Sequence, residues 1–188
     1  MKKILADTSD LELYCCLADR TRAEGAFRAL YERHSRRVYL YCLKILSEKQ
    51  DAMDAFQQTF VKFHRLGQDG VILENIGGYI LRIARNVCID KLRAQKIKLV
   101  PFEEIHFSSH KTSYEEKEFK QLVEMALDLL EPEYREAFVL RELEGLSYEE
   151  ITAITNDTVP ALKNRVWRAK QKIRDILAPY TDEVEWLK

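Results

Sequence analysis

The sequence contains few helix-breaking residues and no pattern that predicts a β-strand. Only 6 of its 188 residues are glycine and 4 are proline. Apolar residues recur at steps of three and four along most of the chain, which is the spacing of amphipathic helices, and no stretch shows the strict alternation of a half-buried strand. The absence of strand patterns argues against sheet and barrel architectures. We therefore expect an all-α fold.

Long apolar runs, a strong net charge and paired cysteine motifs are also missing. Charged residues interrupt every apolar run before the roughly 18 residues that a membrane span needs. The start of the chain turns acidic at Asp7, too early for a signal peptide. The net charge is −1, so any affinity for nucleic acid must come from a local basic patch. We expect a cytoplasmic protein without membrane insertion.

The four cysteines show no CxxC spacing, which fits a reducing, cytoplasmic setting. Adjacent Cys15 and Cys16 could form a redox or metal sensor, but two small apolar helix residues are the favoured interpretation. His106 and His110 lie four residues apart in a segment without helical period, and no further ligands complete a zinc site.

Catalytic constellations are absent as well. There is no glycine-rich phosphate loop before a helix, no HExxH motif and no Ser/His/Asp arrangement. Glu48, Asp51 and Asp54 lack the Glu-x-x-His partners of helical di-metal sites. We therefore expect no catalytic residue, no metal and no cofactor, and an enzyme is disfavoured.

The most informative stretch lies between residues 142 and 177. Gly145 ends one helix, and Ser147 with Glu150 forms an S-x-x-E capping box that begins a short helix. After a break at residues 155–158, Thr158 can cap a longer helix. The buried face of that longer helix is expected to comprise Leu162, Val166, Ala169, Ile173 and Leu177. A short helix, a tight turn and a second helix form a helix-turn-helix.

The charge of this stretch favours binding to nucleic acid. From Thr158 to Arg174 there are six Lys/Arg and no Asp/Glu, whereas residues 97–188 as a whole hold 13 basic and 19 acidic residues. An ordinary helical hairpin with a solvated charged face is the alternative interpretation. Positive charge segregated within an acidic half is what phosphate binding requires, and it favours the helix-turn-helix.

Six further helices are predicted before this motif. Thr21 with Glu24, and Ser47 with Gln50, are interpreted as two more capping boxes. The predicted helices cover residues 10–18, 21–46, 47–66, 79–95, 114–130 and 132–143. The residues of the third helix that are expected to face inward are Met53, Phe56, Phe60, Val61 and Phe63. Four glycines between residues 67 and 78 predict a loop there.

Residues 79–96 form a second basic surface, and a two-domain organisation follows. Its cations, set against the single acid Asp90, are Arg82, Arg85, Lys91, Arg93 and Lys96. Residues 97–113 lose all periodicity and contain Pro101, which indicates an interdomain linker. The expected organisation is a first domain at residues 1–96 and a second at residues 114–188, with a frayed tail after Pro179.

Five segments carry a family resemblance. In the first half they are AFRALYERHSRRVY, DAMDAFQQTF and YILRIARNVCIDKLR, and in the second half LEPEYREAFVLRELEGLSYEEI and ALKNRVWRAKQKI. In this order and at this spacing, they resemble regions 2 and 4 of the bacterial RNA polymerase sigma factors, specifically the extracytoplasmic-function class of the sigma-70 family. The resemblance spans residues 23–96 and 115–176.

The resemblance implies an alternative-type sigma factor that binds core RNA polymerase, at its β′ clamp and β flap, and directs promoter-specific initiation. The residues that it implies for polymerase binding are Asp51, Asp54, Gln57 and Gln58. Those implied for the melted −10 element, together with the loop at 67–78, are Arg82, Arg85 and Asn86. Those implied for the −35 duplex are Lys163, Asn164, Trp167 and Arg168, with Arg141 at the phosphates. An anti-sigma factor is a further partner that the resemblance allows.

The sequence departs from the family pattern at three of its positions. Gln58 stands where an acid is usual, Tyr79 where tryptophan is usual, and Pro160 where glycine is usual. The proline removes one backbone N–H that could hold a phosphate.

Two other classes of function remain open. One is a stand-alone helix-turn-helix regulator with an N-terminal ligand or dimerisation domain, which the basic helix at 79–96 disfavours. The other is a helical adaptor without a DNA role, which the segregated charge disfavours.

Overall fold

The computed structural model describes residues 8–97 and 122–178, and every regular element in those two ranges is helical. The first range, here called the first unit, contains α2 (Asp10–Cys15), the 3-10 turn η1 (Cys16–Ala18), α3 (Ala23–Leu46), α4 (Lys49–Gln68) and α5 (Ile76–Ile97). The second unit contains a helix at 122–128, α7 (Pro132–Phe138), the π-helical segment η2 (Val139–Leu143), α8 (Tyr148–Thr155) and α9 (Val159–Leu177). The all-α expectation is confirmed. The predicted linker, His106 and His110, residues 114–121 and the C-terminal tail lie outside the described residues.

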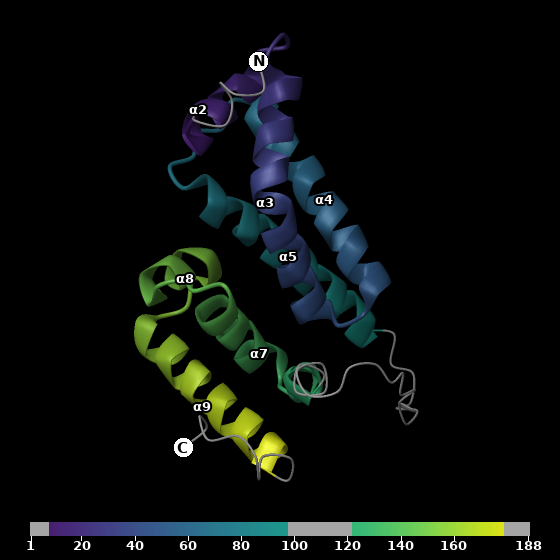
Figure 1. The fold of residues 1–188 in the computed structure, drawn as a ribbon, viewed down its shortest axis with the longest axis vertical. Coiled ribbons are helices and arrows are strands. Elements are labelled where there is room, and N and C mark those ends of the chain that lie inside the picture. The colour runs from purple at the N-terminus through teal and green to yellow at the C-terminus, as the bar shows by residue number, and fades with distance from the viewer. Residues whose placement is uncertain (1–7, 98–121, 179–188) are drawn as a thin grey trace, which may run out of the picture.

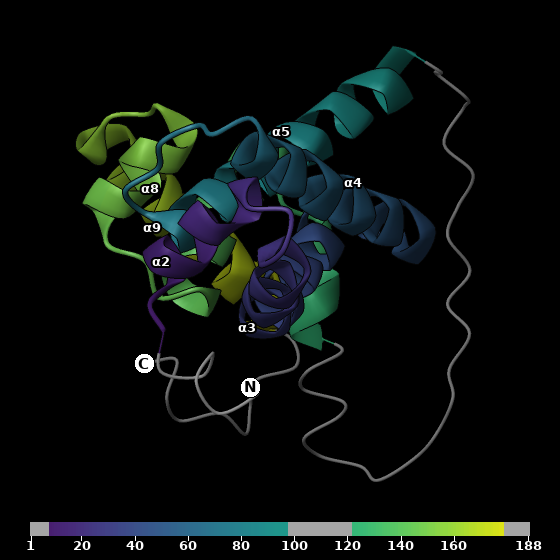
Figure 2. The ribbon, with the colours of Figure 1, turned by 90° about the horizontal axis from the view of Figure 1, so that it is seen from above.

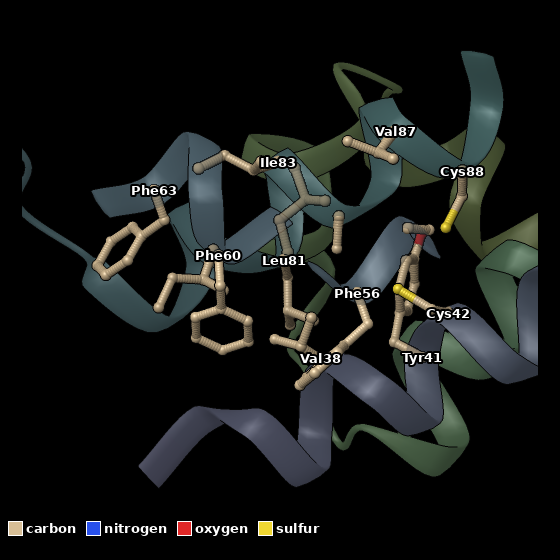
Figure 3. Packing of buried hydrophobic residues seen from close by; sticks show 14 of the residues in the cluster. Val38, Tyr41, Cys42, Phe56, Phe60, Phe63, Leu81, Ile83, Val87 and Cys88 are labelled. Carbon is tan, nitrogen blue, oxygen red and sulfur yellow. The ribbon is translucent and has the colours of Figure 1, made fainter. Parts of the chain in front are cut away.

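The first unit is a bundle in which α3, α4 and α5 pack side by side and α2 crosses one end (Figure 1). Its interior joins large side chains from all three long helices, among them Tyr41, Phe63 and Leu81, each fully buried (Figure 3). Four of the five apolar residues that were expected to face inward from α4 are buried or half-buried, but Val61 is 69% exposed. Val61 lies one turn after Gln57, so the helical period places it on the solvent side with that residue.

The second unit places α9 against α7 and the helix at 122–128. All five apolar residues that were predicted to face inward from α9 are buried, namely Leu162, Val166, Ala169, Ile173 and Leu177. The predicted capping box at Ser147 and Glu150 is present, with both reciprocal hydrogen bonds. Thr158 caps α9 by accepting a hydrogen bond from the Ala161 N–H.

Two of the predicted capping boxes are wrong. The Thr21 hydroxyl donates to Asp19 instead, and α3 begins after Arg22 without a side-chain cap. Ser47 ends α3 at a φ of 59°, and its hydroxyl turns to the second unit, where it donates to Asp128 at 2.5 Å. The N–H of Gln50 is capped by the carboxylate of Glu48.

The glycine-rich loop is shorter than the sequence predicted. The helix α4 continues through Gly67 to Gln68. Gly67 is buried where a Cβ would lie 2.4 Å from Leu17 Cδ1, so only glycine allows the close approach of α4 to Leu17. At the other end, the Asn75 side chain accepts a hydrogen bond from the N–H of Gly78 at 2.9 Å and begins α5. The loop therefore comprises residues 69–75.

The two units are packed against each other. Leu146, Ile151 and Ile154 of the second unit are buried in one apolar cluster with the interior of the first unit. The helix α8 contacts α5, and both ribbon views place these helices side by side (Figures 1 and 2). No helix among the described residues is long and apolar enough to span a membrane.

Candidate nucleic-acid interface

The helix α9 presents a polar and aromatic face to solvent, opposite its buried stripe. Lys163, Asn164 and Arg168 are exposed, and Trp167 is exposed to 59% although it is the largest side chain of the helix. All four lie in the first three turns of α9, directly after the tight turn whose Asn156 adopts the left-handed conformation at φ 62°. Residues at the start of such a helix are those that can reach base edges in a major groove.

The ring of Tyr148 supports two cations beside this face. The Arg141 guanidinium carbon lies 4.8 Å from the ring centroid, and Lys163 Nζ lies 5.6 Å from it. Arg141 also donates to the carbonyl of Leu146 at 2.7 Å, which fixes the guanidinium next to the start of α8. The structure thus brings Arg141 of η2 and Lys163 of α9 together at one ring.

Ion pairs neutralise half of the positive charge on α9. Arg165 pairs with Asp157 at 2.5 Å, Lys170 with Glu142 at 3.0 Å, and Lys172 pairs with Glu131. Within the described residues, the cations of α9 without an acidic partner are Lys163, Arg168 and Arg174. Two of these three are residues that the sequence nominated for duplex binding.

A second polar site lies between α4 and α5. Asn86 is exposed on α5 and borders a hollow of about 440 Å³ whose other edge carries Lys62 and Arg65 of α4. The hollow has an apolar floor, to which Leu66 and Ile83 contribute. Asp69 also lines the hollow, which therefore offers apolar side chains, one amide, two cations and one acid. The amide, the cations and the apolar side chains have the chemistry to hold a flat heterocycle attached to a phosphate.

Sequence reasoning nominated Asn86 but missed Lys62 and Arg65. Both cations are exposed and lie three residues apart, a spacing that places them on one side of α4. That spacing is visible in the sequence, but only the packing of α4 on α5 reveals that these side chains share a hollow with Asn86.

The other two residues nominated for the −10 element have different surroundings. Arg82 is exposed at the edge of a cleft of about 270 Å³ between α5 and α8. Arg85 instead points to the second unit, where its Nε and Nη2 donate to the two carboxylate oxygens of Glu136 at 2.8 and 3.1 Å. In this arrangement Arg85 is not on the same open surface as Arg82 and Asn86.

The face nominated for the polymerase lies on α4. Gln57 and Gln58 are exposed and line a shallow hollow of about 320 Å³ together with Asp54 and Val61. Val61 was not nominated; its side chain is 69% exposed and adds an apolar group to this face. Asp51 is less accessible, because Lys91 of α5 donates to it at 2.8 Å, and this bond raises the pKa of Lys91.

Comparison with known proteins identifies the family of both units. The sequence matches the family described as Sigma-70 region 2 over residues 30–97 and the family described as Sigma-70, region 4 over residues 120–173. The chain belongs to the sigma-70 family of RNA polymerase sigma factors. The region 2 match covers most of the first unit, so the alternative of a stand-alone regulator with a ligand domain is not favoured.

Curated relatives are RNA polymerase sigma factors, and several of them, SigE of Mycolicibacterium smegmatis and SigM of Bacillus subtilis among them, are named as members of the extracytoplasmic-function (ECF) class. This chain is similar to the ECF RNA polymerase sigma factor SigE of Mycolicibacterium smegmatis, with 31% identity over 82% of this chain and 62% of the relative. It is also similar to the RNA polymerase sigma factor CarQ of Myxococcus xanthus, with 28% identity over 88% of this chain and 97% of the relative. The chain therefore spans less than two thirds of SigE and nearly all of CarQ.

Two solved structures share the fold. The sigma factor RpoE of Bartonella quintana, solved with the anti-sigma factor NepR, matches with a TM-score of 0.66 and 22% identity over 81% of this chain and 96% of that chain. CnrH, solved with the cytosolic domain of CnrY, matches with a TM-score of 0.66 and 22% identity over 90% of this chain and 97% of that chain.

Proposed function

We propose that this sigma factor binds core RNA polymerase and directs promoter-specific initiation by recognising a −10 and a −35 element. The observation that carries the proposal is the presence of two separate polar sites, one on α9 and one at Asn86, on units that match regions 4 and 2. The protein contributes no catalysis of its own and acts in the cytoplasm. Its functional domains are residues 1–96 and 114–188, joined by a linker at 97–113.

The −35 duplex is read by the start of α9. Lys163, Asn164 and Arg168 offer donors that can meet base edges in the major groove, while Trp167 offers an apolar surface for a thymine methyl group or a sugar. Arg141, held by the Leu146 carbonyl and the Tyr148 ring, serves as a phosphate contact.

The melted −10 element is held by the first unit. A base that has left the stack can enter the hollow next to Asn86, whose amide supplies both a donor and an acceptor for the edge of the base. Lys62 and Arg65 at the rim suit the phosphates on either side of that base. The exposed Ile72, in the loop at 69–75, provides an apolar contact next to the separated strand.

Core polymerase is bound mainly through α4. The β′ clamp meets the face with Asp54, Gln57, Gln58 and Val61, which line one hollow together with Lys62. Asp51 contributes at its edge, and the second unit docks at the β flap. An anti-sigma factor is a further proposed partner, since a sigma factor of this fold was solved with such a protein.

Co-purification of the full chain with core polymerase tests the proposal. A sigma factor should comigrate with core polymerase in gel filtration and support run-off transcription from a promoter that core polymerase alone does not use. A stand-alone regulator would bind promoter DNA without comigrating with core polymerase, and a helical adaptor would bind neither. Either of these two results would refute the proposed function.

A further inference from the structure

Two tyrosines border the exposed face of α9. Tyr148 of α8 holds Arg141 and Lys163 beside its ring. Tyr134 of α7 lies next to Arg168, whose Nη1 donates a hydrogen bond to the Tyr134 hydroxyl at 3.3 Å. Lys163 and Arg168 are five residues apart, so the helical period places them towards opposite edges of the face. Because α7 packs on α9, Tyr134 extends that face onto a neighbouring helix (Figure 1).

The ring of Tyr134 is held by the core of the second unit. It is half-buried and packs against the apolar cluster that includes Ala169 and Ile173 of α9. The hydroxyl reaches the surface, where its hydrogen bond with Arg168 is exposed. A tyrosine with a packed ring and a solvated hydroxyl keeps its oxygen in one place, since the ring cannot turn freely. The long side chain of Arg168 therefore has a fixed partner at the edge of the face.

The charges around Tyr134 leave the guanidinium of Arg168 without an acid. Lys172, one turn further along α9, has its Nζ 4.9 Å from the centroid of the Tyr134 ring and pairs with Glu131. The hydrogen bond from Lys172 lowers the pKa of Glu131, so that carboxyl is ionised at neutral pH and its charge cancels that of Lys172. Among the described residues, Arg168 has only the neutral Tyr134 hydroxyl as a partner, and its positive charge stays available.

The Tyr134 hydroxyl also has a hydrogen left to donate. A phenol oxygen that accepts from a guanidinium keeps its own hydrogen for an acceptor, and residues 8–97 and 122–178 supply no such acceptor. Accepting from a cation polarises the O–H group and strengthens it as a donor. A hydroxyl donor next to a guanidinium without an acidic partner fits an anionic oxygen. In duplex DNA that oxygen belongs to a backbone phosphate.

We propose that Tyr134 and Arg168 form a binding site for one backbone phosphate of duplex DNA, at the α7 edge of the −35 interface. Tyr134 accepts from Arg168 Nη1 and donates its hydroxyl hydrogen to a phosphate oxygen, while other N–H groups of Arg168 donate to the same phosphate. This inference rests on the proposed reading of the duplex by α9. It adds α7 to the DNA interface through a residue that the sequence did not nominate.

Binding of the full chain to a panel of mixed-sequence duplexes tests the hydroxyl. Tyr134→Phe removes the hydroxyl and keeps the packed ring, and Tyr39→Phe makes the same change at a half-buried position of α3 as the control. Fluorescence anisotropy should show about tenfold weaker binding of every duplex by Tyr134→Phe, because a hydrogen bond to a charged group is lost. The slope of log K against log salt should not change, since a neutral hydroxyl displaces no counterion. Binding of Tyr134→Phe with wild-type affinity would overturn the proposal.

A double-mutant cycle with Arg168→Ala distinguishes a shared phosphate from a purely structural tyrosine. Arg168→Ala alone should weaken binding of every duplex and reduce the salt slope by about one. Adding Tyr134→Phe to Arg168→Ala should then cost little more, because two groups that bind the same phosphate are not additive. Losses that multiply in the double variant would show that the two residues act independently, and they would overturn the shared site.

Glu131→Gln tests whether the α7 edge faces the DNA backbone. It removes the acid that neutralises Lys172, so a second cation becomes available beside Tyr134. The variant should bind every duplex more tightly, and its salt slope should steepen by about 0.9. Glu133→Gln, which removes an exposed acid two residues further along, is the control and should match the wild type. Wild-type affinity and slope for Glu131→Gln would place this edge away from the DNA and overturn the proposal.

The wild-type chain and core polymerase keep this test distinct from that of the proposed function. If the wild type binds the duplexes and Tyr134→Phe binds them equally well, the phosphate site fails and the reading of the duplex by α9 stands. If the wild type binds no duplex, either alone or together with core polymerase, the proposed reading of the −35 element fails and the phosphate site fails with it.

Discussion

Lys91 donates a hydrogen bond to Asp51 at 2.8 Å and thereby joins the nominated polymerase face on α4 to the helix that carries Asn86. The same ammonium lies 3.4 Å from Asp54, whose side chain is 43% exposed. Polymerase binding and −10 recognition are thus proposed for two helices that share an ion pair. Substitutions on α4 must therefore be examined for both effects.

Asp54→Lys should weaken binding to core polymerase. The new ammonium would repel a basic partner surface and Lys91, yet at a partly exposed position we expect it to cost less than about 1 kcal/mol of folding stability. Glu24→Lys, the same charge reversal at a far more exposed position on α3, is the matched control and should bind core polymerase normally. Unchanged affinity of Asp54→Lys in a pull-down would remove this face from the polymerase interface.

Lys163→Ala and Arg168→Ala should weaken binding to the −35 duplex. A residue that contacts a base should cost about 1–3 kcal/mol and relax specificity at one base pair. A phosphate contact should instead weaken binding to all sequences alike and reduce the salt slope by about one. Arg174→Ala, an exposed cation in the last turn of α9, serves as the control and should have little effect. Promoter binding that both nominated variants leave intact at every salt concentration would contradict the assignment of α9.

Gly67→Ala should destabilise the first unit. A Cβ at this position would lie 2.4 Å from Cδ1 and 2.7 Å from Cβ of Leu17, so η1 would have to shift. Overpacking of this kind costs about 1–3 kcal/mol, which exceeds the roughly 0.5–1 kcal/mol that alanine usually gains over glycine within a helix. Gln68→Ala, at the next and exposed position, should be nearly neutral. Urea denaturation that shows Gly67→Ala to be as stable as the wild type would contradict the close packing.

Local sequence patterns predicted the helix-turn-helix in detail. The inward face of α9, the capping box at Ser147 and the cap at Thr158 all depend on successive residues no more than four positions apart, and all are confirmed. The box predicted at Ser47 failed because its hydroxyl donates to Asp128, a residue 81 positions away. A local motif cannot reveal a competing partner at that distance.

The parts of the candidate site that depend on contacts between distant segments could not be predicted from the sequence. Asn86 was nominated from its helix, but the hollow that it shares with Lys62 and Arg65 exists only once α4 packs on α5. Glu136 gave no signal at all, since a single glutamate on an amphipathic helix is usually solvated. Its partners Tyr41 and Arg85 lie 95 and 51 positions away.

The central claim is that this chain captures a melted base, which separates a sigma factor from a regulator that reads duplex DNA alone. Asn86→Ala should leave binding to core polymerase and to the −35 duplex intact, because neither surface includes α5 at this position. It should slow open-complex formation, since unstacking a base costs a few kcal/mol that the lost amide no longer helps to offset. Asp90→Ala, exposed one turn further along α5, is the control.

Permanganate footprinting of the mutant holoenzyme during open-complex formation measures this directly. We predict slow appearance of reactive thymines in the −10 element of a duplex promoter with Asn86→Ala, normal kinetics with Asp90→Ala, and a smaller defect on a template that is already melted over the −10 element. Melting by Asn86→Ala at the wild-type rate on the duplex promoter would contradict base capture at Asn86.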